Sequence, residues 1–254
     1  MIKTKLAVLA LAALSLTACK KDDEEETVTP TPTPTTGTVK LAFTFVNGTD
    51  PFTINTTVQD GAGHNVRFSA LKFYASDFHL ADDADVEVGM FHEKVVLVDA
   101  SASTNTFTMG SISPAHVHHL HMSLGLDAEL NHADPTIAAA PLNDPTMHWS
   151  WNPAAGYKFL LMEGHVDGNN DGDFEDAEDA SFTYHCATDA LLREAEIHLH
   201  AEVAAGAEAT MQAQLDVARL ISGLDLLANG MAMGAQPANV TAMDSLVVSI
   251  MEVE

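Results

Sequence analysis

The sequence predicts an all-β domain, an antiparallel β-sandwich of the Ig-like or Greek-key type with a few short helices. Two observations predict this fold class. Apolar and polar residues alternate with a period of two over many short runs, and turn-forming clusters such as 47–51 and 60–63 separate these runs. Residues 39–254 are long enough for one domain of this kind, with ample chain for a core.

The first 18 residues are expected to be a lipoprotein signal peptide. Lys3 and Lys5 form a basic start, and 6–16 is an apolar run too short for a stable transmembrane helix. Leu16-Thr17-Ala18-Cys19 matches a bacterial lipobox, so Cys19 is the predicted lipidation site and the membrane anchor.

Residues 19–38 read as a tether between the lipid and the domain. A charged run (20–26) precedes a Thr-Pro repeat (27–38), and neither can bury apolar surface. Lysines and then acidic residues after the lipid cysteine resemble the export tag of surface lipoproteins. We therefore expect an outer-membrane or cell-surface location; a solubilising spacer and the periplasmic side stay open.

The domain's elements follow from the hydrophobic period. The alternating runs, each a predicted strand, are 39–46, 66–73, 93–98, 116–126, 181–186, 196–203 and 211–221. Three stretches are candidate short helices, namely 135–140, 224–232 and 242–251.

Residues 147–164 contain both tryptophans and predict a hairpin around a Pro/Gly turn at 152–156. Alternation places Trp149 and Trp151 on one face of its first strand. The cluster is either a buried aromatic core or, if the indoles are exposed, a stacking platform for a glycan.

Composition excludes one class of partner. With 36 acidic and 11 basic residues, the formal net charge is −25, so the surface repels nucleic acid and attracts cations. Cys19 is used by the lipid, which leaves Cys186 without a disulfide partner. Alternation places Cys186 opposite His185, so we interpret it as a core residue.

Thirteen histidines are many for this length, and they cluster. One group lies in 116–121 and the other in 196–203, and imidazole is a ligand for copper, zinc and nickel. These strands are either the polar outer face of a sandwich or a secondary metal site with the candidates His119, His121, His198 and His200. A copper or zinc redox enzyme would need the two strands adjacent with at least three converging imidazoles.

Residues 167–178 match the calcium-loop pattern D-x-N-x-D-G-x₅-E. The flanking segments are strands rather than EF-hand helices, so we predict a structural calcium site in a hairpin loop; a solvated acidic loop is the alternative. The predicted ligands are Asp167, Asn169, Asp171, Asp173 and Glu178.

Several short motifs resemble the MbnP-like copper-binding proteins, relatives of a methanobactin-associated protein. They are N-H-A-D-P at 131–135, W-S-W followed by G-Y-K-F-L, and F-T-Y-H at 182–185. The resemblance implies copper binding by His132 and His185. It also implies oxidation of Trp149 or Trp151 to kynurenine by a di-haem peroxidase-like partner.

Taken together, the sequence predicts a lipid-anchored copper-binding protein for copper acquisition, storage or delivery, and not an enzyme. The alternatives are a surface adhesion or glycan-binding sandwich and a copper or zinc redox enzyme. Thioether ligands for copper could come from Met147, Met162, Met231 and Met233, although methionines more often fill cores.

Overall fold

The computed structural model describes residues 35–150 and 152–253. The predicted signal peptide, Cys19, most of the tether and Trp151 lie outside this part of the chain. Within it, no helix has the length and apolar character needed to cross a membrane.

Strands dominate the described residues. They are β1 (Gly37–Asn47), β2 (Asp50–Pro51), β3 (Thr57–Gln59), β4 (Asn65–Ala81), β5 (Glu87–Asp99), β6 (Thr106–Ile112), β7 (Ala115–Leu124), β8 (Lys158–Asp167), β9 (Ala180–Ala187), β10 (Arg193–Val203), β11 (Glu208–Asp216), β12 (Met231–Met233) and β13 (Ile250–Glu252). The helical segments are α1 (Ala128–Asn131), η1 (Pro153–Ala155), η2 (Asp189–Leu191), α2 (Val217–Ile221) and α3 (Pro237–Ser249).

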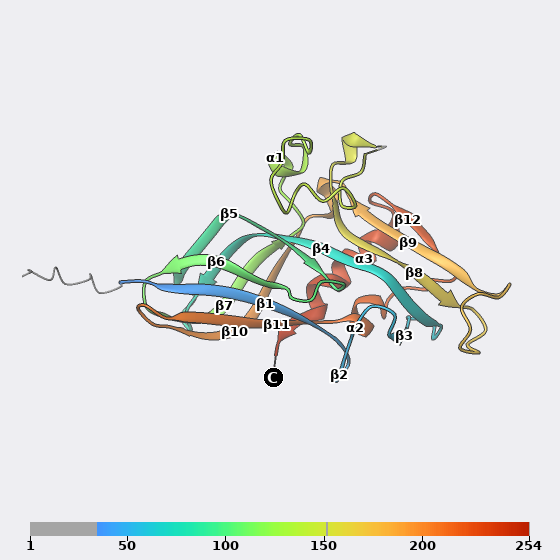
Figure 1. Ribbon diagram of the computed structural model, residues 1–254, viewed down its shortest axis with the longest axis horizontal. Helices are drawn as coiled ribbons and strands as arrows, with labels where there is room; N and C mark the ends of the chain where they lie inside the picture. Colours follow the sequence, from blue (N-terminus) through green and yellow to red (C-terminus); the bar gives the residue numbers. More distant parts are fainter. Residues whose placement is uncertain (1–34, 151, 254) are drawn as a thin grey trace, which may run out of the picture. The chain divides into compact units, whose positions relative to one another are not determined.

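These strands form two sheets, so the predicted all-β sandwich is confirmed (Figure 1). One sheet has the order β13-β11-β1-β2, with β6 also paired to β1, and the larger has the order β10-β7-β4-β8-β9-β12, with β3 and β5 also paired to β4. Most pairs are antiparallel, but β1–β11 and β9–β12 are parallel. These parallel pairs join strands that are distant in sequence, because a parallel pair needs a long connection.

The core lies between the inner faces of the two sheets. Phe43 of β1 and Phe73 of β4 meet edge to face across the interface with ring centroids 5.7 Å apart. Cys186 is fully buried on this inner side, where its thiol contacts the Asn239 carbonyl of α3, and burial raises its pKa. It is therefore a core residue, as the alternation predicts.

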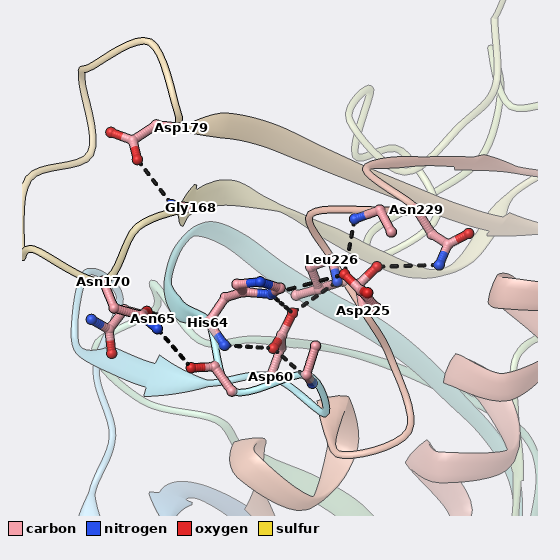
Figure 2. A network of polar contacts seen from close by, with 12 residues as sticks. Asp60, His64, Asn65, Gly168, Asn170, Asp179, Asp225, Leu226 and Asn229 are labelled. Atoms are coloured by element: carbon pink, nitrogen blue, oxygen red, sulfur yellow. Dashed lines mark hydrogen bonds and ion pairs between the residues drawn. The ribbon is translucent and has the colours of Figure 1, made fainter.

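The predicted strand 211–221 and the three candidate helices need correction. The run 211–221 ends as a strand at Asp216, whose carboxylate accepts from the Ala218 and Arg219 N–H groups and begins α2. The 224–232 segment is not helical. The buried Asp60 carboxylate accepts the Leu226 N–H at 2.8 Å and holds this segment as a turn (Figure 2).

The 135–140 segment is also a series of turns, because the Asp134 carboxylate accepts the Thr136 N–H and hydroxyl. The third predicted helix, 242–251, is present as α3 but begins earlier, at Pro237, a residue suited to the first helical turn.

Candidate metal centre

A long segment between β7 and β8 covers part of the outer face of the larger sheet. In Figure 1, α1 and the turn before β8 stand above the β4 and β8 ribbons. Tyr74 of β4 fixes this segment, because its ring packs edge to face on Tyr157 and its hydroxyl donates to the Pro141 carbonyl at 3.2 Å. The sandwich thus gives the candidate site a rigid base.

The predicted tryptophan hairpin is present, but its first strand is reduced to a single bridge between His148 and Tyr157. The Trp149 N–H donates to the Gly156 carbonyl at 3.0 Å, which closes the turn. Trp149 is only 3% exposed and packs with Ala155, Ala187 and Met233. A buried indole cannot stack on a glycan at the surface, so the position of Trp149 argues against the platform interpretation.

His132 is held at the end of α1. Asp127 caps the start of this helix, and His132 follows its last residue. The neighbouring Asn131 is buried: its side-chain NH₂ donates to Asp189 at 2.7 Å, and its side-chain oxygen Oδ1 accepts the Tyr157 N–H at 2.7 Å. His132 Nε2 lies 3.0 Å from the other Asp189 oxygen.

His185 approaches the same turn from β9. Its ring lies 6.4 Å from the Trp149 ring and nearly perpendicular to it. Its Nε2 lies 2.7 Å from Glu163 Oε1, whereas its buried Nδ1 has no hydrogen-bond partner among the described residues. A buried ring nitrogen without a partner is rare and requires an explanation.

The electrostatics favour neutral His185. Burial lowers its pKa most, and Lys158 lowers it further, against the opposing effect of the Glu163 hydrogen bond. Hydrogen bonds from Asn131 and then His132 lower the pKa of Asp189. The site therefore contains a neutral imidazole and an ionised carboxylate at neutral pH.

This arrangement fits a metal centre. Metal-binding imidazoles commonly use one nitrogen for the ion and the other for a carboxylate that orients the ring. His185 with Glu163 and His132 with Asp189 both have that carboxylate at Nε2, which leaves Nδ1 on the opposite side of each ring for an ion. Both histidines are fixed to the Trp149–Gly156 turn, one through Asn131 and one through the indole contact.

The structure separates the four candidate thioethers. Met147 and Met162 are fully buried in the main core, and Met231 is 72% exposed. Met233 packs against Trp149 and is the register partner of His185 in the β9–β12 pair. Met233 is therefore the one candidate thioether placed at the site.

Sequence reasoning did not identify the residues that orient the histidines, namely Asn131, Glu163 and Asp189. Asn131 is the one of the three with a sequence signal, because it precedes His132 in the N-H-A-D-P motif. Glu163 and Asp189 give no such signal, because their roles depend on strand pairing and on the η2 turn.

The acidic loop between β8 and β9 has the turn expected at Gly172, where φ is +92°. The Asp167 carboxylate accepts the Asp171 and Gly172 N–H groups, which are positions five and six of the motif. The Gly168 N–H donates to Asp179 at 3.0 Å, just beyond the motif (Figure 2).

The other four predicted calcium ligands lie along this loop. Asn169 donates to Asp171, and Asp171 accepts the Asp173 N–H, so the loop is closed by its own side chains. The Glu178 side chain is exposed. Desolvation, and then the charges of the nearby carboxylates Asp179 and Glu178, raise the pKa of Asp176. Negative charge is therefore concentrated in this loop, and a bound cation would offset it.

The histidine-rich strands 116–121 and 196–203 prove to be neighbours, as β7 and β10. His119 and His198 lie opposite each other in this pair, His121 lies opposite Glu196, and His200 bonds to Glu252 at 2.7 Å. All four histidines that the sequence marks as secondary candidates therefore lie on one patch.

Comparison with known proteins gave two findings. The family model described as MbnP matches residues 36–241. The solved structure of MbnP from Methylosinus trichosporium is similar, with a TM-score of 0.56 and 15% sequence identity, covering 82% of this chain and 87% of that chain. At this identity the structural match shows a shared fold. No curated protein sequence matches the chain.

Proposed function

Because the chain belongs to the MbnP family, we propose that it binds copper at His132 and His185, beside Trp149, for acquisition, storage or delivery of the metal rather than for catalytic turnover. One observation carries the proposal. The buried Nδ1 of His185 has no partner while Glu163 holds its Nε2. A copper ion would supply the missing partner.

The ligand set suits copper. Two neutral imidazoles are a sufficient set for Cu(I), and the Met233 thioether next to Trp149 is a soft ligand of the kind that selects Cu(I). Acidic residues outnumber basic residues by 36 to 11, so the surface attracts a cation. The imidazoles bind the ion in their neutral form.

The family resemblance also supports a modification of the site. We propose that a di-haem peroxidase-like partner oxidises a tryptophan to kynurenine, with Trp149 as the candidate whose position is described. Its ring packs against Met233 and contacts His185, so a product formed there would lie next to the metal. The other candidate remains Trp151.

Two further elements complete the proposal. The lipobox at Cys19 supports attachment to the outer membrane or cell surface. The match of 167–178 to a calcium pattern, with its turn at Gly172, supports a structural calcium ion held by the five predicted ligands.

Titration with Cu(I) against a competing chelator tests the copper site. We expect tight binding in the wild type and its loss in the double variant His132→Ala/His185→Ala, because Cu(I) then loses both imidazoles. X-ray absorption of the wild type should show nitrogen ligands at about 2.0–2.1 Å, the distance of metal-bound imidazole in proteins.

The double variant His198→Ala/His200→Ala is the control, since it removes two histidines from a different strand. It should keep the tight Cu(I) site. Equal Cu(I) affinity in the wild type and the His132/His185 variant would contradict the proposal.

Mass spectrometry of the native protein tests the oxidation of tryptophan to kynurenine. The modified protein should be about 4 Da heavier, because one oxygen is gained and one carbon is lost.

A further inference from the structure

A second cluster of imidazoles lies on the outer face of the β7–β10 strand pair. Ring centroids are 4.6 Å apart for His118 and His119, 4.5 Å for His119 and His198, and 5.5 Å for His118 and His198. His200 is a further neighbour, 4.5 Å from His118. These residues come from two strands far apart in sequence, so only the fold brings them together.

The strand pairing explains how adjacent residues share a face. Consecutive side chains of a regular strand point to opposite faces. Here the register shifts between His198 and Ala201 of β10 as it pairs with β7, and such irregularities redirect side chains. As a result His118 and His119, although consecutive, both contact the His198 ring.

The nitrogen atoms of this cluster are arranged for chelation. His118, His119 and His198 each offer a ring nitrogen within 4.8 Å of the other two. Three imidazoles on one tetrahedral ion have nitrogens roughly 3.4 Å apart, as follows from a metal–nitrogen distance of about 2.0–2.1 Å. Small side-chain rotations would close the difference.

Two of the buried nitrogens are not satisfied. Nδ1 of His118 and Nδ1 of His119 are both buried and make no hydrogen bond within the described part of the chain. Their nearest carboxylate oxygens, on Asp83 and Glu196, lie 3.1 and 3.4 Å away without hydrogen-bond geometry. His119 as a whole is 8% exposed.

Carboxylates lie around the cluster. The β4–β5 turn brings Asp83 and Asp85 to His118 and His119, and Asp82 fixes that turn by accepting the Ala84 and Val86 N–H groups. Their negative charge would lower the cost of bringing a cation to the imidazoles.

An ion-pair network of protonated histidines is the competing interpretation. It accounts for the carboxylates, but not for three imidazole rings packed on one another. Cationic rings in such contact would repel, whereas neutral rings that share an ion would not.

We propose that His118, His119 and His198 form a second metal site, which takes one divalent transition ion of the imidazole-preferring class, zinc or Cu(II). His116 and His200 complete the surrounding shell. The site goes beyond the proposed function. In the larger sheet β4 and β8 separate β7 from β9. The β4 partner of His119 is Ala81, whereas His185 lies at the level of Lys72 of β4, and this offset corresponds to roughly 30 Å along the strands, so the two centres are separate sites.

Equilibrium dialysis with Zn²⁺ alone tests the site, since zinc is redox-silent and accepts three imidazoles. We expect the variant His118→Ala/His198→Ala to bind one zinc ion fewer per chain, or to bind it at least about 100-fold more weakly, the upper range for loss of a supporting group. The double variant His132→Ala/His185→Ala should keep this zinc, so failure here and failure of the copper proposal are distinguishable.

The control is His165→Ala, which removes an exposed histidine of β8 from outside the cluster and should leave zinc binding unchanged. If circular dichroism shows that the double variant does not fold, His198→Ala alone, at an exposed position, should weaken zinc binding at least about 10-fold. Repeating the dialysis with Cu²⁺, with its electron paramagnetic resonance spectrum, distinguishes the two ions.

Unchanged zinc binding in the His118/His198 variant would overturn the proposal. An equal loss of zinc binding in the His165→Ala control would also overturn it. So would a zinc ion that is lost only in the His132→Ala/His185→Ala variant.

Discussion

At the residue scale, the charge state of His185 determines whether it can bind a metal. Its neighbour Lys158 is itself mostly buried and donates to the Thr146 carbonyl at 2.7 Å. Burial lowers the pKa of both side chains, and Lys158 further lowers that of His185. A positive charge beside the imidazole therefore discourages protonation and keeps a ring lone pair available for a metal ion.

Replacing Lys158 with Met should raise the pKa of His185, because the opposing charge is removed while most of the packing volume is kept. An NMR titration of the His185 ring protons measures this. Copper binding by the variant should weaken at a higher pH than binding by the wild type, because protons then compete earlier for the imidazole.

The sign for folding follows from the same shift. His185 has a lower pKa in the folded than in the unfolded chain, so between the two values the unfolded chain binds more protons and stability falls as pH drops. Lys158→Met should reduce that loss. The control Lys94→Met, on β5, should leave the His185 titration unchanged, and a lowered His185 pKa in the Lys158 variant would contradict the argument.

At the element scale, the position of α1 depends on a close approach at Gly156. This glycine has φ of +74°, and a Cβ there would overlap Asn131 Oδ1 and the Asn131 carbonyl oxygen. Asn131 in turn bonds to Asp189 and to the Tyr157 N–H. The tryptophan turn and the His132 helix thus form one unit that only glycine permits.

Gly156→Ala should displace Asn131 and weaken copper binding, in addition to a cost of about 1–3 kcal/mol for an L-residue at this positive φ. Chelator competition measures the copper affinity, and urea unfolding measures the stability. Gly48→Ala is the matched control: its φ is +64° with nothing within 4 Å of the added Cβ. It should lose stability and keep copper affinity, and equal copper affinity in both variants would show that the Asn131 contact is unimportant.

At the scale of the whole molecule, the acidic loop after β8 connects separate parts of the larger sheet. Asn170 accepts the Asn65 N–H at the start of β4, and its amide donates to the Gly63 carbonyl in the β3–β4 turn. That turn also contains Asp60, which binds the 222–229 segment through the Leu226 N–H (Figure 2). Ordering this loop therefore constrains several chain segments at once.

We expect calcium to raise the melting temperature of the protein, because an ion bound only by the folded state stabilises it by about 2.7 kcal/mol at a hundredfold excess over Kd. Differential scanning calorimetry with and without calcium measures this. Asp171→Ala should abolish the effect, whereas Asp50→Ala, which removes an exposed carboxylate from β2, should retain it. A calcium-independent melting temperature in the wild type would refute the calcium site.

The sequence by itself determined the fold class, the larger strands and the candidate ligand residues. Period-two alternation is a local property that each strand carries in its own residues, so β1, β9 and β10 were predictable. Where prediction failed, at 224–232, a distant carboxylate, Asp60, competes with helix formation.

Only the tertiary structure decided which histidines have partners and which share a site. Glu163 reaches His185 because β8 pairs with β9, and His118 meets His198 because β7 pairs with β10 in a shifted register. Such contacts depend on pairing between segments distant along the chain, and no local pattern encodes that pairing. A metal centre needs ligands placed to within about half an ångström, so its residue types can be read from sequence, but its assembly comes from the packed sheet.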